Sequence, residues 1–172
     1  MDPPLKICVY MFGQDDPKKC TAAKLVRFGL AKQVRHISHK TVLLNPLARE
    51  PLSKQTCTTC DSVCAVDCSW ERAAYVLTRQ RGLRQGNHRR LPAMLAANPT
   101  NYAKIGRLSS VEALAGSLFV LGHQDKASEL LNKFKWGPTF LKLNNDLLND
   151  YLNADSLQSI LETEQEYFGH LY

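Results

Sequence analysis

The stretch "SVCAVDCSWERAAYVL" (residues 62–77) decides the fold class, because a hydrophobic run changes here into a helical pattern. Residues 62–69 are apolar without regular alternation, which is typical of a strand buried on both faces. From residue 70 the apolar positions recur at helical spacing. A buried strand that leads directly into a helix is a building block of parallel sheets, so this stretch favours an α/β fold.

Two more apolar runs of the same kind precede it, at residues 5–12 and 41–46. The first is followed by a Gly/Asp/Pro loop and by a helix that we expect over 22–32, with Thr21 as its N-cap. Continuous apolar strands interleaved with helices predict a parallel sheet covered by helices on both faces.

The second half of the chain has the pattern of a helical region. One more extended element is expected over 91–102. Ser109 and Glu112 form a capping box for a helix that ends at Gly122, and three shorter helices are expected after it. We therefore predict two domains, an α/β domain over 1–92 and an all-α domain over 93–172.

Positive charge is concentrated in the first two thirds of the chain, although the net charge is only +6. Residues 17–110 carry seventeen Lys and Arg against four Asp and Glu, whereas residues 143–172 carry six acids and neither Lys nor Arg. Such a field attracts polyanions, and nucleic acid is the commonest of these in the cytoplasm. A basic surface that serves only solubility would give the same charge.

The hydropathy pattern indicates a soluble, cytoplasmic protein. The N-terminal residues lack the basic segment and long apolar stretch of a secretory signal, and charge interrupts every long apolar run. With 172 residues and 44% apolar side chains, the chain is long enough for a sizeable core. We expect a monomer without a membrane span.

The loop before the first helix is a candidate anion site. Backbone N–H groups near Thr21 and Ala22, with lysines at 18, 19 and 24, suit a carboxylate or phosphate, although an ordinary capped helix has the same pattern. Cys20 could be a nucleophile with a lowered pKa, but no base is paired with it in a known motif, so a packed thiol is favoured.

Four cysteines, at 57, 60, 64 and 68, could hold zinc or iron–sulfur. Cys64 and Cys68 fall about 13 Å apart on one face of a straight strand, too far for one metal. Buried thiols or a disulfide between neighbours are therefore favoured, and we expect no metal.

The end of the quoted stretch is a candidate ligand site. Asp67 stands at the carboxyl end of a buried strand, where open α/β sheets place their ligand crevices, and Trp70 would flank it. A carboxylate there can accept a proton and an indole can stack on a base, although a helix cap beside a core tryptophan is the alternative.

Downstream, a cluster suited to binding phosphates comprises Arg79, Arg81, Arg84, Arg89 and Arg90, with His88.

Six blocks together closely resemble the ribosome-biogenesis aminocarboxypropyl transferases that hypermodify small-subunit rRNA, in particular the archaeal members, which lack an acidic tail. The blocks lie in colinear order from about residue 5 to 152: "DPKKCTAAKL", "LLNPLA", "VDCSW", "RRLPAMLAANPTNY", "LSSVEALAGSLFVLG" and "KFKWGPTFLKLN".

The resemblance implies a SPOUT-like, trefoil-knotted α/β domain followed by helices that complete its pocket. It also implies that S-adenosylmethionine binds with its γ-carbon, and not its methyl group, exposed to the RNA. The aminocarboxypropyl group would move to N3 of a modified uridine, commonly N1-methylpseudouridine, and methylthioadenosine would leave. A SPOUT methyltransferase and a catalytically silent RNA-binding assembly factor are the alternatives.

Site residues follow from the same resemblance. Asp67 would be the catalytic residue, receiving the N3 proton or orienting that nitrogen. The RNA phosphates would lie against Lys19, Lys24 and Arg27. The cofactor would be bound by Thr21, Leu44, Pro46, Val66, Trp70, Ala73, Leu91 and Leu108.

The sequence departs from the family pattern at two positions. Ala22 and Ala103 stand where the family usually has glycine. Both changes restrict the backbone, at the expected carboxylate contact and at the turn after Tyr102.

Overall fold

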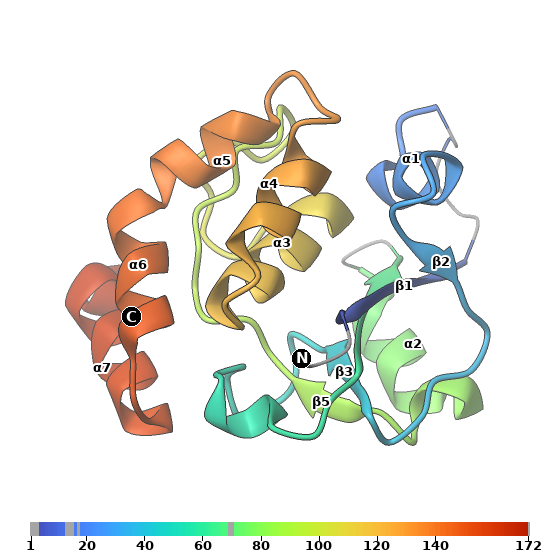
Figure 1. The fold of residues 1–172 in the computed structure, drawn as a ribbon, viewed down its shortest axis with the longest axis horizontal. Helices are drawn as coiled ribbons and strands as arrows, with labels where there is room; N and C mark the ends of the chain where they lie inside the picture. The colour runs from blue at the N-terminus through green and yellow to red at the C-terminus, as the bar shows by residue number, and fades with distance from the viewer. Residues whose placement is uncertain (1–3, 13–15, 17, 69–70, 172) are drawn as a thin grey trace.

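The computed structural model describes residues 4–12, 16, 18–68 and 71–171. These residues form five strands and seven α-helices (Figure 1). The strands are β1 (Lys6–Met11), β2 (Lys32–Gln33), β3 (Thr41–Leu44), β4 (Ser62–Asp67) and β5 (Asn87–Arg89). The helices are α1 (Thr21–Arg27), α2 (Ala73–Arg79), α3 (Ser110–Val120), α4 (Gln124–Leu131), α5 (Gly137–Leu143), α6 (Asn145–Asn153) and α7 (Leu157–Phe168).

The five strands form one sheet in the order β2-β1-β4-β3-β5. Every pair is parallel, as the continuous apolar runs predicted. The central strand β4 pairs with β1 along its whole length, from Lys6 opposite Ser62 to Met11 opposite Asp67. The carboxyl ends of the strands therefore meet at one edge, where parallel sheets bind ligands.

Helices cover both faces of the sheet. On one face, α2 packs against a small apolar cluster that includes Leu43, Cys64 and Val76. On the other face, α1 and α3 pack against Val9 and Val63 in a larger cluster that continues into the helical half of the chain. The helices of residues 110–168 therefore share their core with the sheet.

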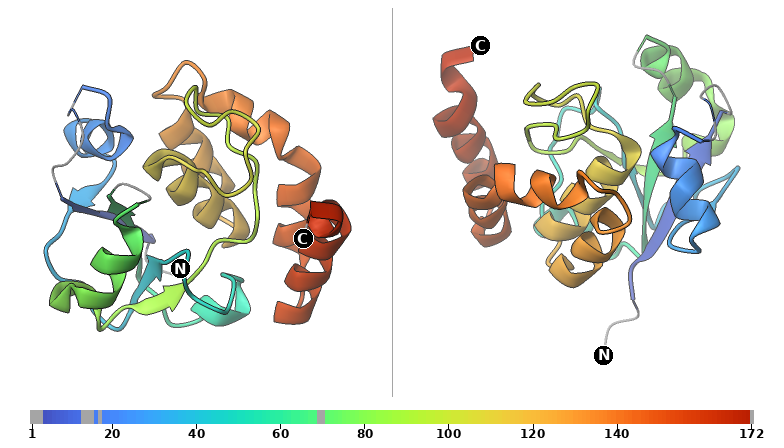
Figure 2. Two further views of the ribbon diagram at one scale, coloured as in Figure 1. Left: turned by 180° about the vertical axis from the view of Figure 1, so that it is seen from behind. Right: turned by 90° about the horizontal axis from the view of Figure 1, so that it is seen from above.

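The acidic C-terminal helices and the basic N-terminal elements lie on opposite sides of the molecule. Figures 1 and 2 show α6 and α7 on one side, and α1, α2 and the β1–β2 edge on the other. This arrangement separates the acidic C-terminal helices from α1 and α2 in the basic half of the chain.

Helix α1 is shorter than expected and begins differently. Cys20, and not Thr21, is its N-cap, because the Cys20 sulfur accepts a hydrogen bond from the Ala23 N–H while Thr21 occupies the first helical position. The helix ends at Arg27 instead of residue 32, and Gly29 follows with φ +71°. Residues 32–33 then form β2, an edge strand that the sequence pattern did not indicate.

The prediction of an extended element over 91–102 is wrong. The described residues there contain one isolated bridge, from Leu95 to Ile105, and the strand that joins the sheet is β5 within the arginine-rich segment. The capping box of Ser109 and Glu112 is confirmed at the start of α3.

Three helices were expected after α3, and the described residues form four, α4 to α7. Asn144 separates α5 from α6, because its side-chain amide exchanges hydrogen bonds with the backbone of Leu95, at 2.8 Å to the N–H and 2.9 Å to the carbonyl. No helix among the described residues is long and apolar enough to cross a membrane.

Candidate functional site

A large cavity lies at the carboxyl ends of β3 and β4. Its volume is about 990 Å³, and it is bordered by the start of α1, the start of α3, the 90–108 segment and one face of α7. This is the size range of sites that bury a small organic ligand.

The cavity brings together residues that the sequence analysis assigned to a cofactor site from five separate blocks. Asp67, the expected catalytic residue, lies in the lining beside Val66. Trp70 lies outside the described residues. The other expected cofactor residues all line the cavity: Thr21, Leu44, Pro46, Val66, Ala73, Leu91 and Leu108.

Asp67 is held by a cysteine. The Cys20 thiol donates a hydrogen bond to Asp67 Oδ2 at 3.0 Å, while its sulfur caps α1. Burial, and then this hydrogen bond, raises the pKa of Cys20 from its ordinary value of 9.0 to about 11. The thiol therefore stays protonated at neutral pH, which suits a packed donor and not a nucleophile.

Thr21 connects two helices at the rim of the cavity. Its Oγ1 accepts a hydrogen bond from the Val111 N–H in the first turn of α3, at 3.2 Å. This contact crosses 90 residues of sequence. The starts of α1 and α3 are thereby fixed against each other at the same wall of the cavity.

A buried carboxylate holds the loop that carries Asn98, another residue of the cavity lining. Glu112 is fully buried, and its two oxygens accept hydrogen bonds from the backbone N–H groups of Ala97, Asn98 and Ser109 at 2.6, 3.0 and 2.7 Å. They also accept from Asn98 Nδ2 and Ser109 Oγ at 2.7 and 2.8 Å. The capping box was predicted, but its role in holding the 97–98 backbone depends on a tertiary contact.

The C-terminal helix supplies a wall that the sequence analysis missed. Glu164 of α7 lines the cavity and forms a two-pronged ion pair with Arg90, at 2.6 and 2.8 Å. Glu164 Oε1 also accepts a hydrogen bond from the Ala93 N–H at 2.8 Å. The helical pattern of α7 was visible in the sequence, but the partner of this acid, 74 residues away, was not.

The expected RNA contacts lie together around α1. Lys19 lines the cavity directly before the helix. Lys24 and Arg27 follow on α1, with Lys24 Nζ 5.8 Å from the centre of the Phe134 ring. Of the three cations, Lys19 alone lines the cavity, and Lys24 and Arg27 lie further along the helix whose start borders it.

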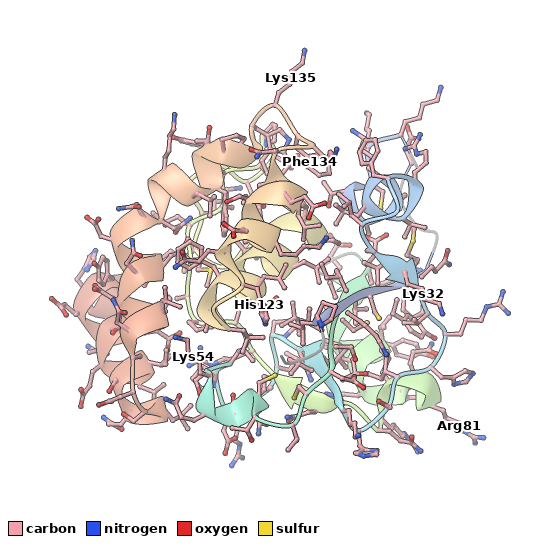
Figure 3. The ribbon with its side chains drawn as sticks, viewed as in Figure 1. Lys32, Lys54, Arg81, His123, Phe134 and Lys135 are labelled. Atoms are coloured by element: carbon pink, nitrogen blue, oxygen red, sulfur yellow. The ribbon has the colours of Figure 1, made fainter. Side chains whose placement is uncertain are left out.

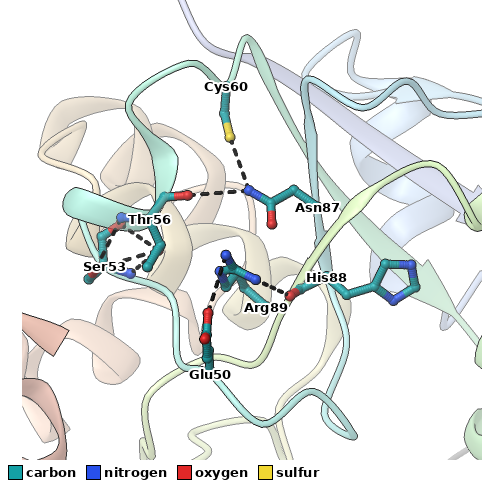
Figure 4. A network of polar contacts seen from close by, with 7 residues as sticks. All are labelled: Glu50, Ser53, Thr56, Cys60, Asn87, His88 and Arg89. Atoms are coloured by element: carbon teal, nitrogen blue, oxygen red, sulfur yellow. Dashed lines mark hydrogen bonds and ion pairs between the residues drawn. The ribbon is translucent and has the colours of Figure 1, made fainter. Parts of the chain in front are cut away.

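The arginine cluster divides into two groups. The Arg89 guanidinium lies 3.3 Å from Glu50 and donates to the His88 carbonyl (Figure 4). Arg90, the residue after β5, is paired with Glu164. Arg89 and Arg90 therefore both have structural partners. Exposed side chains make up the other group, namely Arg79, Arg81 and Arg84.

The cysteines are free thiols, and Cys57 is in hydrogen-bonding contact with Cys60. Asn87 donates to the Thr56 carbonyl at 3.2 Å and to Cys60 Sγ at 3.8 Å, which ties β5 to the 56–60 turn (Figure 4). Burial raises the pKa of Cys57 and of Cys64. Within the described part of the chain, no three His, Cys, Asp or Glu side chains gather closely enough to hold a metal ion.

The curated relatives and the solved structure agree on one kind of protein. The sequence model of the family described as "Ribosome biogenesis protein, C-terminal" matches residues 42–168. A protein of Thermoplasma volcanium named 16S rRNA aminocarboxypropyltransferase is 46% identical over 160 residues, covering 91% of this chain and 94% of that protein. A Halobacterium salinarum protein of the same name is 43% identical over 158 residues, covering 90% of this chain and 92% of its own.

A solved structure is also similar. It is described as the SAM-dependent rRNA:acp-transferase Tsr3 from Vulcanisaeta distributa, with a TM-score of 0.83 and 37% identity, covering 97% of this chain and 90% of that one. A second family model, "Possible Fer4-like domain in RNase L inhibitor, RLI", matches residues 5–36. That segment holds only Cys8 and Cys20, fewer than the four thiolates of an iron–sulfur cluster.

Proposed function

The chain belongs to the family of 16S rRNA aminocarboxypropyltransferases, and on that premise we propose that it acts on N3 of a modified uridine or pseudouridine. It is an S-adenosylmethionine-dependent transferase of ribosome biogenesis, and the group it moves to rRNA is 3-amino-3-carboxypropyl. The observation that carries the proposal is the position of Asp67, within the large cavity at the carboxyl edge of the sheet.

The residues of the cavity fit the group donor. Leu44, Pro46, Leu91 and Leu108 give one part of the lining an apolar character that suits an adenine ring. Backbone at Val66 lies beside them, where a carbonyl can accept hydrogen bonds from ribose hydroxyls. The polar end, with Lys19 and Thr21, suits the methionine carboxylate.

Orientation of the donor decides the reaction. We assign Ala73 to the wall that holds the methyl group away from the RNA, and the family resemblance implies the same role for Trp70, which lies outside the described residues. Ala73 is buried and lines the cavity at the start of α2. With the amino-acid arm near Thr21, the γ-carbon lies on the Asp67 side of the cavity, because the Cys20–Asp67 hydrogen bond joins these two parts of the lining.

Asp67 removes the proton that makes N3 a poor nucleophile. The bound donor supplies an electrophilic γ-carbon attached to a sulfonium leaving group. As the N3–carbon bond forms and the carbon–sulfur bond breaks, the N3 proton goes to the Asp67 carboxylate and the sulfur keeps the bonding electron pair. General-base assistance of this kind contributes about 10²- to 10⁴-fold, and alignment of N3 with the carbon–sulfur bond contributes the rest.

Further parts of the proposal concern the whole chain. Lys19, Lys24 and Arg27 contact phosphates of the small-subunit rRNA, which suits Lys19 in the cavity lining and the other two on the helix that starts at the cavity. The chain works as a monomer in the cytoplasm, its sheet is SPOUT-like and trefoil-knotted, and its domains span 1–92 and 93–172. The shared core between sheet and helices supports domains that act as one unit around the cavity.

A dual-label experiment tests the reaction. The protein is incubated with small-subunit rRNA and S-adenosylmethionine that carries ¹⁴C in the carboxyl group or, in a parallel reaction, ³H in the methyl group. Transfer of the aminocarboxypropyl group puts ¹⁴C and no ³H into the RNA and releases methylthioadenosine. Methyl incorporation with S-adenosylhomocysteine release would establish the methyltransferase alternative, and an RNA without label would establish a silent assembly factor.

A further inference from the structure

We propose that a second groove, beside the catalytic cavity, binds single-stranded rRNA next to the target nucleotide. The groove has a volume of about 700 Å³ and lies between the end of β1, the residues after β2 and the end of α2. The proposal rests on the proposed function, since it places the same RNA in both sites. The groove is lined by Tyr10, Met11, Phe12, residues 33–36 and residues 79–82.

The two walls of the groove are joined by direct contacts. The Ile37 N–H donates to the Gly82 carbonyl at 3.0 Å, and a Cβ at Gly82 would collide with the Arg35 carbonyl oxygen. Tyr10 Oη lies 3.4 Å from Gln80 Oε1, which links β1 to the end of α2. A preformed groove avoids much of the entropy cost of ordering a binding site.

The lining suits a polyanion. Arg35 and His36 stand on one wall, Arg79 and Arg81 stand on the other, and all four are exposed. Figure 3 shows Arg81 at the outer edge of the molecule, beyond α2. The described residues that line the groove include neither Asp nor Glu. Arginine forks match phosphate oxygens, so the walls suit a phosphate backbone.

Aromatic rings give the groove its second property. Tyr10 and Phe12 are half-buried on one face of β1, with ring centres 5.1 Å apart. Nearby on α2, the Arg79 guanidinium lies 5.2 Å from the ring centre of Tyr75, which is 61% exposed. Aromatic rings combined with cations are the usual features of sites for single-stranded nucleic acid, where bases stack and phosphates pair.

The groove adjoins the reaction site. Met11 lines the groove and pairs in register with Asp67, and the Phe12 N–H donates to the Asp67 carbonyl at 3.3 Å. Paired strands lie about 4.8 Å apart. An RNA strand with its target base at Asp67 therefore reaches the groove by passing over the carboxyl end of β1.

The charge part is tested by RNA binding as a function of salt. The probe is a fluorescent single-stranded rRNA fragment that contains the target nucleotide and several neighbours on each side. Arg35→Gln/Arg81→Gln should reduce the slope of log K against log salt by about 1.4, as expected for two lost phosphate contacts on a single strand. The matched control Lys54→Gln/Lys142→Gln removes two charges from exposed positions outside both sites, and it should change the slope much less. Equal slopes in the two variants would overturn the proposal.

The stacking part uses Phe12→Leu, which keeps an apolar side chain. It should weaken binding of the same fragment about tenfold, the effect of one lost stacking contact. Calorimetric titration with S-adenosylmethionine shows whether the variant keeps its fold and donor site. Unchanged RNA affinity in a variant that still binds the donor would overturn the stacking role.

Shortening the RNA fragment shows which of its nucleotides bind in the groove. An RNA reduced to the target and one neighbour should bind wild type and Arg35→Gln/Arg81→Gln alike, whereas a difference that persists would overturn the assignment to flanking nucleotides. In turnover, the variant should raise KM for the long fragment more than it lowers kcat. Absence of group transfer by wild type would refute the proposed function, while the binding measurements would still decide the groove.

Discussion

The Cys20 thiol donates a hydrogen bond to the Asp67 carboxylate across 3.0 Å, although 47 residues separate them in the chain. The same sulfur accepts from the Ala23 N–H and begins α1. One side chain therefore fixes both the carboxylate expected to act on N3 and the helix start expected to hold the methionine carboxylate.

Asp67→Asn should lower kcat by about 10²-fold or more while S-adenosylmethionine binding stays within a few-fold of wild type. The amide is nearly the same size but cannot take the N3 proton. Methylthioadenosine release gives kcat, and calorimetry gives the donor affinity. Full activity of the variant would remove Asp67 from the proton transfer.

Cys20→Ser and Cys20→Ala should differ in both activity and stability. Serine keeps both the donor to Asp67 and the cap of α1, so it should retain most activity and stability. Alanine loses both contacts and should cost about 1 kcal/mol of unfolding free energy, together with a lower kcat. Urea denaturation and single-turnover rates measure the two effects, and equal behaviour of both variants would contradict this role.

The free energy of unfolding should fall as the pH rises from about 9 to 11. The pKa of Cys20 is about 11 in the folded protein against an ordinary 9.0, so in this window the unfolded thiol loses its proton while the folded thiol keeps it. The unfolded state then binds fewer protons, and stability declines with pH. Because other cysteines are also buried, the comparison is with Cys20→Ser, whose urea midpoint should decline less steeply.

Glu112→Gln should destabilise the protein by about 2–3 kcal/mol, measured by urea denaturation. Five donors face its carboxylate, and the amide nitrogen of glutamine cannot accept from any of them. The 97–98 backbone would move, so donor affinity should also fall. Wild-type stability would show that the buried network tolerates the exchange.

Glu164→Gln should weaken donor binding and reduce stability by about 1–2 kcal/mol. The change removes the charge that pairs with Arg90, at a position where the glutamate side chain is 12% exposed. Glu166→Gln, at an exposed position on the same helix, is the control and should stay near wild type. Identical behaviour of the two variants would show that α7 does not depend on this ion pair.

Ala103→Gly should stabilise the protein by up to about 1 kcal/mol. Ala103 has φ +61°, a left-handed conformation in which an L side chain is strained and glycine is not. The turn after Tyr102 therefore keeps the conformation that the family's glycine favours. Thermal unfolding measures the gain, and a loss of stability would show that the Cβ of Ala103 has favourable contacts.

The sequence by itself determined the local structure. The apolar runs at β1, β3 and β4 predicted a parallel sheet, because strands buried on both faces cannot alternate with polar residues. Ser109 and Glu112 predicted the start of α3, since a capping box needs only neighbours within one turn. The block resemblance predicted cofactor residues that the cavity brings together, apart from Trp70, which lies outside the described residues.

Only the tertiary structure decided the partners of distant groups. The Cys20–Asp67 and Arg90–Glu164 contacts join residues 47 and 74 positions apart, and no periodicity within one helix or strand records such pairs. Short elements were missed for the same reason: β2 and β5 have two and three residues, and they are strands because β1 and β3 offer them hydrogen-bonding edges. Local pattern fixes what a segment can become, while packing fixes which carboxylates, thiols and cations meet around the cavity.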